Sequence, residues 1–503
     1  ASSGYLRMPV GKRVSAAVSG RVSYLDALYG GMLDDGHMRA SYGLCDLDVA
    51  VTGEISDADR VRGTFHYNGD HLDYDDHDFS LLTGLRWSNL LGGADWRHDG
   101  ERLWTEQGVW GSRFANDLVL DMNAVRLKAP TAISEVGMRG VFGMDGVAER
   151  VDVRWGYGAR HCTVTPQRVE MTGFGNDGGR KGGDVNVTAA KVWGEAVIRL
   201  GRRWRLTGGL EGAMVTGADG YRSRWVDPRF TAMLGWDGGN VTLHAGSYHQ
   251  WLHQVGFSEM GMSSNFKLGP SDKAPVERGL NVAVAWSHRV AEWLSVNADG
   301  FYKRISDEPE YLGAVLDIVD ADYRAEDYVR VTSGYNAGGS VSARFERDGV
   351  SATAAYGYCV GKRRFDGGGS FDATGVLRHT ATLSAGWRID SHWNVSGVMK
   401  VASGRPYTPV KAVYFIGERL MMEYGARNSA RLPLYHRLDL GADYEFRTGK
   451  LTHRVNVSVV NVYGQRNVEM STFTVDMESG RYVRREVNSL LRWLPSLSYT
   501  VLF

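Results

Sequence analysis

The sequence predicts an all-β protein that forms one large antiparallel transmembrane β-barrel of about 22 strands, of which about 20 to 21 lie in this chain. Three observations predict this fold. Apolar and polar residues alternate over long segments, and short turns alternate along the chain with long polar connections. Glycine is abundant at 64 residues, whereas proline is scarce at 11. This combination is typical of many strands that are joined by tight turns.

Alternation with a period of two residues is clearest in four segments, at 377–388, 393–401, 437–446 and 497–503. In the third of these, Leu438, Leu440 and Tyr444 alternate with Arg437 and Asp439. Soluble strands usually have about five or six residues, and these segments are about twice as long. The interior of a soluble sandwich could not hold such a series of charges, whereas a water-filled barrel can. The pattern therefore favours a membrane barrel over a soluble β-sandwich.

Turns and loops are expected to differ between the two ends of the barrel. Short periplasmic turns are predicted at 9–11, 57–59, 99–100, 145–146, 201–202, 238–239, 289–290, 348–349, 390–391 and 448–449. Long extracellular loops are predicted at 26–39, 70–79, 162–183, 215–224, 249–276, 304–330, 361–375, 402–434 and 463–492. Outer-membrane barrels show this asymmetry.

The strand count suggests that the barrel needs more than this chain. About 20 strands follow Lys12, and residues 4–8 form the end of an earlier strand. Single-chain bacterial barrels have an even number of strands, so the total becomes about 22, with the first strand outside the sequence. We therefore expect residues 1–503 to form the barrel domain. We expect an N-terminal domain that would fill so large a barrel to lie outside this sequence.

Composition excludes several other classes. Lysine plus arginine equals aspartate plus glutamate at 58 each, which gives no reason to expect a nucleic-acid partner. No run of 18 apolar residues occurs, so the sequence predicts no transmembrane helix. The three cysteines, Cys45, Cys162 and Cys359, lack the spacing of a metal site. No secretory signal peptide is recognisable at the first residues.

Local motifs occur along nearly the whole chain in the order of one known family. The chain resembles the barrel domain of TonB-dependent outer-membrane transporters (receptors). The motifs that carry this resemblance lie at 19–26 (SGRVSYLD), 228–230 (PRF), 246–250 (GSYHQ), 296–311, 334–336 (GYN), 403–409 (SGRPYTP), 431–440 (RLPLYHRLDL) and 459–463 (VVNVY), and the last is the terminal aromatic Phe503.

The resemblance implies energised uptake of a nutrient across the cell outer membrane. It further implies a lipid bilayer around the barrel, the protein's own N-terminal plug domain inside it, and the TonB–ExbB–ExbD complex as the source of energy. On this interpretation, inward charges hydrogen-bond the plug, and we expect them at Arg378, Arg388, Lys400, Arg437, Asp439 and Glu445. The alternative is a plugless structural barrel in an envelope complex, with a surface lipoprotein as partner. A passive porin is a further alternative.

Four polar segments are candidate sites, each with a plainer interpretation. Residues 69–78 contain five aspartates with His71 and His77, which suits a metal but also a solvated acidic loop. Residues 249–254 (HQWLHQ) suit a sugar, peptide or chelate, or simple packing over the barrel mouth. Residues 307–327 are predicted to be acidic surface, and 366–370 (DGGGS) a loop tip without a P-loop lysine. We predict no catalytic, cofactor-binding or metal-binding residues, and the substrate-binding residues are unknown.

Overall fold

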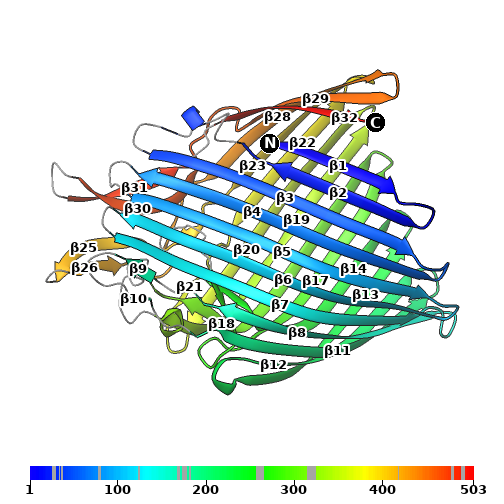
Figure 1. Ribbon diagram of the computed structural model, residues 1–503, viewed down its shortest axis with the longest axis horizontal. Coiled ribbons are helices and arrows are strands. Elements are labelled where there is room, and N and C mark those ends of the chain that lie inside the picture. The colour runs from blue at the N-terminus through cyan, green and yellow to red at the C-terminus, as the bar shows by residue number, and fades with distance from the viewer. Residues whose placement is uncertain are drawn as a thin grey trace.

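The computed structural model describes residues 1–24, 30–32, 34, 38–76, 81–122, 125–166, 170–172, 178–179, 183–255, 266–313, 324–416, 419–476, 481–488 and 493–503. Within these residues one antiparallel sheet of 24 strands curves into a barrel (Figure 1). Three of its strands, β9 (Glu170–Thr172), β10 (Gly178–Gly179) and β21 (Ser370–Asp372), are only two or three residues long. The remaining 21 form the wall, and the predicted fold class is confirmed.

The wall strands follow one another in chain order, each antiparallel to the next. They are β1 (Ser2–Pro9), β2 (Val14–Val22), β3 (Met38–Glu54), β4 (Asp59–Asp76), β5 (Leu81–Asp99), β6 (Leu103–Met122), β7 (Val125–Met144), β8 (Val151–Thr165), β11 (Val185–Leu200), β12 (Trp204–Thr216), β13 (Arg222–Trp236), β14 (Gly239–Gln250), β17 (Glu277–Ala291), β18 (Leu294–Tyr311), β19 (Val329–Arg347), β20 (Val350–Phe365), β22 (His379–Arg388), β23 (Trp393–Ala402), β28 (Tyr435–Thr448), β29 (Leu451–Val460) and β32 (Leu494–Leu502).

The four segments with the clearest alternation become β22, β23, β28 and β32, as predicted. One face of these strands is apolar and open to the surroundings: Leu383 is 53%, Leu440 46% and Leu497 74% exposed. The opposite face carries charges such as Arg437 and Asp439. In a membrane barrel the apolar face contacts lipid and the polar face lines the lumen. Among the described residues, no helix has the length and apolar character that crossing a membrane requires.

Tryptophans mark the short-turn end of the wall. Seven exposed tryptophans lie in or next to a wall strand within a few residues of a short turn, namely Trp96, Trp155, Trp204, Trp236, Trp293, Trp387 and Trp393. Exposed tyrosines lie farther along the strands, toward the long-loop end, as Tyr302 and Tyr358 do. Such aromatic belts occur where a barrel meets the two membrane interfaces.

Each predicted short turn lies at or within a few residues of a connection between consecutive wall strands, although 289–290 is still part of β17, and most predicted long loops lie at the other end. Several predicted loops begin inside strands, since residues 304–311 end β18 and residues 361–365 end β20. Residues 70–76 are not loop but the end of β4, which is paired with both β3 and β5, because alternating side chains there continue the ladder. In addition, β6 and β7 are separated by only two residues at the long-loop end.

The wall has two edges, β1 and β32. Each pairs with one neighbour, β1 with β2 and β32 with β29, and no pairing joins them within the described residues. Because 21 strands alternate in direction, the first and the last run the same way. A closed antiparallel barrel therefore needs one more strand, antiparallel to both, between β1 and β32.

Candidate binding site at the barrel mouth

Two connections at the long-loop end fold into the barrel. The first, here called loop A, joins β14 to β17 and is described for residues 251–255 and 266–276. Its strands β15 (His253–Val255) and β16 (Phe266–Leu268) pair with each other, and β15 lies against β18 whereas β16 lies against β7 and β8. Five wall strands separate β8 from β18, so a segment that contacts β18 as well as β7 and β8 must cross the inside of the barrel.

Loop A is held by two apolar clusters. Trp251, 5% exposed, and Val276 pack against residues of β8, β11 and β12, among them Cys162 and Val187, which are both fully buried. Phe266, 1% exposed, joins a second cluster with members on β6, β7, β18 and β19. Burying large apolar side chains stabilises such a segment by about 1.5–3 kcal/mol each. Loop A is therefore a packed part of the mouth.

Polar contacts fix the same loop. The Arg160 guanidinium lies 4.4 Å from the Trp251 ring centre. His253, 3% exposed, has its Nε2 2.8 Å from the Pro275 carbonyl oxygen, and burial lowers the pKa of His253 to about 4. The imidazole is therefore neutral at pH 7. The Ala218 amide donates to the Pro270 carbonyl at 3.0 Å and fixes the far end of the loop.

The second connection, loop B, joins β23 to β28 and is described for residues 403–416 and 419–434. It contains the short pair β24 (Pro406–Tyr407) and β27 (Ala430–Arg431), and the hairpin of β25 (Val410–Ile416) and β26 (Arg419–Tyr424). Asn428, 4% exposed, donates from Nδ2 to the Asp372 carbonyl at 2.8 Å and to Thr374 Oγ1 at 3.1 Å. Loop B is thereby tied to the connection between β20 and β22.

Ion pairs gather beneath loop B. The Asp372 carboxylate is held by Lys362, at 2.6 Å, and by Arg378 and Arg431. Although burial acts to raise it, the hydrogen bonds and charges of Lys362 and Arg431 hold the pKa of Asp372 below its usual value. One carboxylate therefore joins three cations from three segments of the chain.

The acidic end of β18 is paired in the same way. Asp307 accepts from Arg278 at 2.8 Å, whereas Glu308 pairs with the buried Arg363 and Glu310 with Arg427 of loop B. Tyr311, the last residue of β18 and 2% exposed, contacts both loops: its ring meets Phe266 edge-on at 5.0 Å, and its carbonyl accepts from Arg427 Nη2 at 3.0 Å. The two loops thus meet at Tyr311.

Below the first cluster of loop A, the inner wall contains a pocket of about 440 Å³ lined from β11, β12, β13 and β14. Glu211 lies between Lys191, at 3.1 Å, and Arg229, at 3.7 Å. The Arg229 guanidinium lies 4.9 Å from the Tyr248 ring centre, and the Tyr248 hydroxyl is 2.6 Å from His244 Nε2. The pocket therefore offers both signs of charge and aromatic faces to the lumen.

The structure separates the predicted candidate segments. His71 lies in β4, His77 lies outside the described residues, and the described part of the chain contains no group of three or more potential metal ligands. Residues 249–254 form the end of β14 and the start of loop A, as the packing interpretation predicted. The acidic residues 307–310 are partners of arginines. Residue spacing gave no sign of these pairs, because their members are up to 117 residues apart.

Several of the inward charges predicted to contact a plug form ion pairs with described residues of this chain. Arg437 donates to Asp439 at 2.8 Å, Glu445 pairs with Arg454 at 2.8 Å, and Arg378 pairs with Asp372.

A serine, a histidine and an aspartate also meet at the ends of β13 and β14. Both Ser247 Oγ and His249 Nδ1 bind Asp227 Oδ1, at 2.7 and 2.8 Å, so the serine donates to the carboxylate and not to the imidazole. A nucleophilic serine needs the opposite arrangement.

Comparison with known proteins agrees with this architecture. A family model described as "TonB dependent receptor-like, beta-barrel" matches residues 45–463. Among solved structures, the ferric yersiniabactin uptake receptor FyuA from Yersinia pestis aligns with a TM-score of 0.71 and 10% identity over 100% of this chain and 77% of its own. BauA, the ferric preacinetobactin receptor from Acinetobacter baumannii, aligns at 0.67 and 11% over 99% and 78%, and the ferric citrate transporter FecA at 0.66 and 11% over the same shares. At these identities the likeness shows the fold alone. No curated protein sequence matches the chain.

Proposed function

Because the chain belongs to the TonB-dependent receptor-like β-barrel family, we propose that it forms the wall and mouth of an outer-membrane transporter that takes up a nutrient with energy from TonB. The family consists of receptors and transporters, and its barrels lie in the outer membrane. In this proposal a plug domain occupies the lumen and contacts its charged inner wall, and the TonB–ExbB–ExbD complex moves the plug.

The observation that carries the proposal is the inward folding of loop A and its meeting with loop B. A passive pore requires an open mouth, whereas here loop A crosses the lumen and loop B meets it at Tyr311. The loops are fixed by buried apolar clusters and by ion pairs, so they offer a preformed surface to a substrate. A substrate that has passed them reaches the charged pocket at Lys191, Glu211 and Arg229.

Transport can be tested even though the substrate is unidentified. Cells that carry the full-length protein are supplied with a mixture of small molecules, and depletion from the medium is followed by mass spectrometry with TonB present or absent. Ferric chelates belong in the mixture because FyuA, BauA and FecA are named for them. We expect at least one compound to be depleted only when both the protein and TonB are present. Depletion that is equal without TonB would indicate a passive porin instead.

The structural alternative is a scaffold barrel with a surface lipoprotein docked on its loops. The family match favours transport. The same experiment separates the two, because a scaffold depletes no compound in either strain. Purification of the intact protein from the membrane, followed by mass spectrometry, identifies any partner chain directly.

A further inference from the structure

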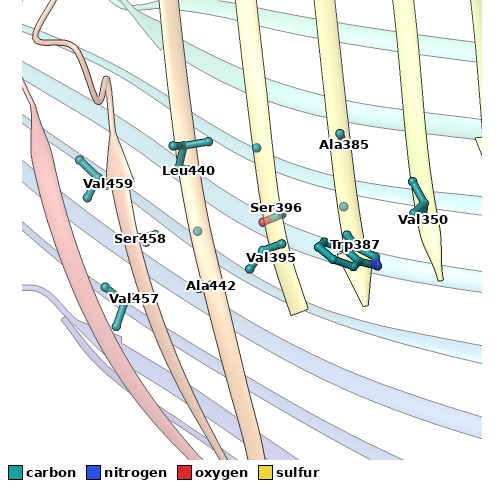
Figure 2. Close-up of a pocket in the computed structure, with 13 residues that line it drawn as sticks. Val350, Ala385, Trp387, Val395, Ser396, Leu440, Ala442, Val457, Ser458 and Val459 are labelled. Carbon is teal, nitrogen blue, oxygen red and sulfur yellow. The ribbon is translucent and has the colours of Figure 1, made fainter. Parts of the chain in front are cut away.

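The tryptophans of the wall are divided unevenly between its two faces. Within the described wall strands, those that face the lumen all belong to β5–β13, and they are Trp87, Trp104, Trp110, Trp193 and Trp225. Val109 and Val192 are 58% and 63% exposed on the outer face, so the tryptophans that follow them point inward. The tryptophans of the later strands lie on the outer face, as Trp387 does at the apolar hollow that it shares with Val395 and Leu440 (Figure 2). One sector of the inner wall is therefore rich in large aromatic rings.

Trp193 of β11 packs on the backbone of the neighbouring strand. Its register partner is Gly156 of β8, and a Cβ at Gly156 would lie 2.8 Å from the indole Cε2. Glycine at this position thus lets the ring approach β8 closely. The rest of the ring is turned to the lumen, where it lines the pocket of about 440 Å³. Trp110 lies close to Gly137 in the same way and donates from Nε1 to Glu135 Oε1 at 2.7 Å.

Charges of both signs surround the Trp193 ring. Four charged side chains line the pocket, and they are Lys191, Glu195, Glu211 and Arg229. Two are cations and two are carboxylates, so their formal charges cancel. Glu211, whose side chain is 14% exposed, lies between the two cations, and Arg229 Nε is buried without a hydrogen-bond partner within the described residues. A ligand with a net charge would leave an unbalanced charge here, so the lining favours a neutral ligand.

A ligand with many hydroxyl groups matches this lining. A hydroxyl both donates and accepts hydrogen bonds, so neighbouring hydroxyls can meet carboxylates and cations that lie side by side. Thr207, Thr231 and His244 add neutral hydrogen-bonding groups to the pocket. The C–H face of a sugar ring is apolar and can pack on an indole ring, which offers a large apolar surface. Paired charges beside an aromatic ring therefore fit a carbohydrate, and the volume is within the range of small-molecule sites.

Two further rings extend the pocket along the wall. Through the register, Trp110 shares a row with Ala189 of β11. Trp104 shares a row with Glu195 of the same strand. Trp193 lies between these two rows, which are about 20 Å apart along the strand. Aromatic rings therefore continue from the pocket toward the mouth and toward the short turns, as binding of several linked sugar rings requires.

We propose that the substrate is a neutral oligosaccharide, and that one of its sugar rings binds on Trp193 with its hydroxyls at Glu211 and Arg229. This inference rests on the proposed function, because it names the substrate class of the same transporter. The pocket lies below loop A, so a sugar that has passed the mouth meets it next. The oligosaccharide then lies between this sector of the wall and the plug.

Native mass spectrometry of the purified full-length protein tests the proposal without TonB. The probes are neutral oligosaccharides from partial acid hydrolysis of starch, xylan and mannan, offered together with ferric citrate and a tryptic peptide digest. We expect an oligosaccharide to be retained in preference to the other two. Trp193→Ala should weaken its retention about tenfold, whereas Trp193→Phe, which keeps a ring, should restore most of it. Glu211→Gln, which removes a charged acceptor, should also weaken it about tenfold.

Trp204→Ala and Glu445→Gln are the matched controls. Trp204 lies on the outer face of β12, and Glu445 pairs with Arg454 on the inner wall at β28 and β29. Both variants should retain the oligosaccharide as the unchanged protein does, and circular dichroism should show equal strand content in all variants. Equal retention in the pocket variants and the controls overturns the proposal. Preferential retention of ferric citrate or of a peptide overturns it as well, as does retention of no probe.

The result is separate from that of the transport assay. Retention of an oligosaccharide at Trp193 supports this inference even if depletion from the medium does not depend on TonB, which would overturn only the proposed function. Depletion that depends on TonB but concerns a compound other than an oligosaccharide would support transport and overturn this inference.

Discussion

Arg427 and Glu310 show how a single contact between distant residues shapes the mouth. Each side chain is 15% exposed, so the pair is shielded from water and from salt. Arg427→Ala leaves the Glu310 carboxylate without its partner and also removes the hydrogen bond to the Tyr311 carbonyl. We expect a loss of about 1–3 kcal/mol in the stability of loop B. Hydrogen exchange at 403–416 and 419–434 should speed up accordingly.

The matched control is Arg344→Ala. Arg344 also pairs with a glutamate, Glu346, but the two side chains are 63% and 55% exposed near a short turn. Exposed pairs contribute about 0–1 kcal/mol, so exchange in loop B should not change. Equal effects of the two substitutions would show that the Arg427 pair does not hold loop B.

His253 should make loop A sensitive to acid. Burial lowers the pKa of His253 to about 4, so the folded loop favours the neutral ring. Above about pH 6.5 the ring is neutral in both the packed and released loop, and its packing is fully retained. Between about pH 6.5 and 4 only the released loop gains a proton, which costs the packed state up to about 3 kcal/mol. Hydrogen exchange at 266–276, corrected for the intrinsic rate, should therefore accelerate from pH 7.5 to pH 5.

His253→Gln tests the cause of this pH dependence. Glutamine can donate to the Pro275 carbonyl as the imidazole does, but it does not titrate. The variant should lose the difference between the two pH values even if its exchange is somewhat faster at both. Persistence of the full difference would assign the effect to another group.

At the scale of the element, loop A depends on a close approach at Gly217. A Cβ at this position would lie 2.0 Å from the Pro270 carbonyl oxygen, which is a backbone atom and not the end of a flexible side chain. Gly217→Ala should therefore displace residues 269–271 at a cost of about 1–3 kcal/mol. Faster cleavage of loop A by an added protease measures this effect. Gly208→Ala, in the same strand pair with open space around its Cβ, should leave cleavage unchanged.

The strands could be predicted from the sequence and the course of the loops could not. Alternation is a local pattern, and it located the strands that contain Leu383, Leu440 and Leu497 together with the face that each residue occupies. Residues 70–76 were misassigned because their closely spaced aspartates resemble a loop while they can equally continue a ladder at the end of a strand. The inward path of loop A depends on Trp251 and Phe266 meeting strands far away in the chain, and no local pattern carries that information.

At the scale of the whole molecule, the strand directions predict that β1 and β32, the two edge strands of the wall, are not direct neighbours. Tyr5 and Ser19 are direct partners in β1 and β2, so cysteines at these positions should cross-link through a reagent that spans one strand spacing, about 4.8 Å. Tyr5→Cys combined with Ser498→Cys of β32 should not cross-link in the intact protein, because the further strand that antiparallel closure requires would separate the two edges by about 10 Å. Efficient cross-linking of the second pair would mean that the edges meet directly.

The candidate site was less predictable than the barrel because it forms where segments that are far apart in the chain come into contact. The sequence indicated the acidic residues near Glu308 and the aromatic residues near Trp251, but it could not show that Arg363 and Arg427 neutralise the former or that Arg160 covers the latter. The family resemblance was confirmed over residues 45–463. The plug and the energy-coupling partners remain predictions of that resemblance.

Tyr311 anchors the two loops by different parts of the same residue. Its ring meets Phe266, whereas its main-chain carbonyl accepts from Arg427. Every amino acid supplies the same main-chain carbonyl, so exchange of the ring alters one half of the entrance and spares the other. Selection for a new substrate can therefore change loop A while loop B keeps its hydrogen bond to the Tyr311 carbonyl. The two halves of the entrance can then diversify separately on an unchanged wall.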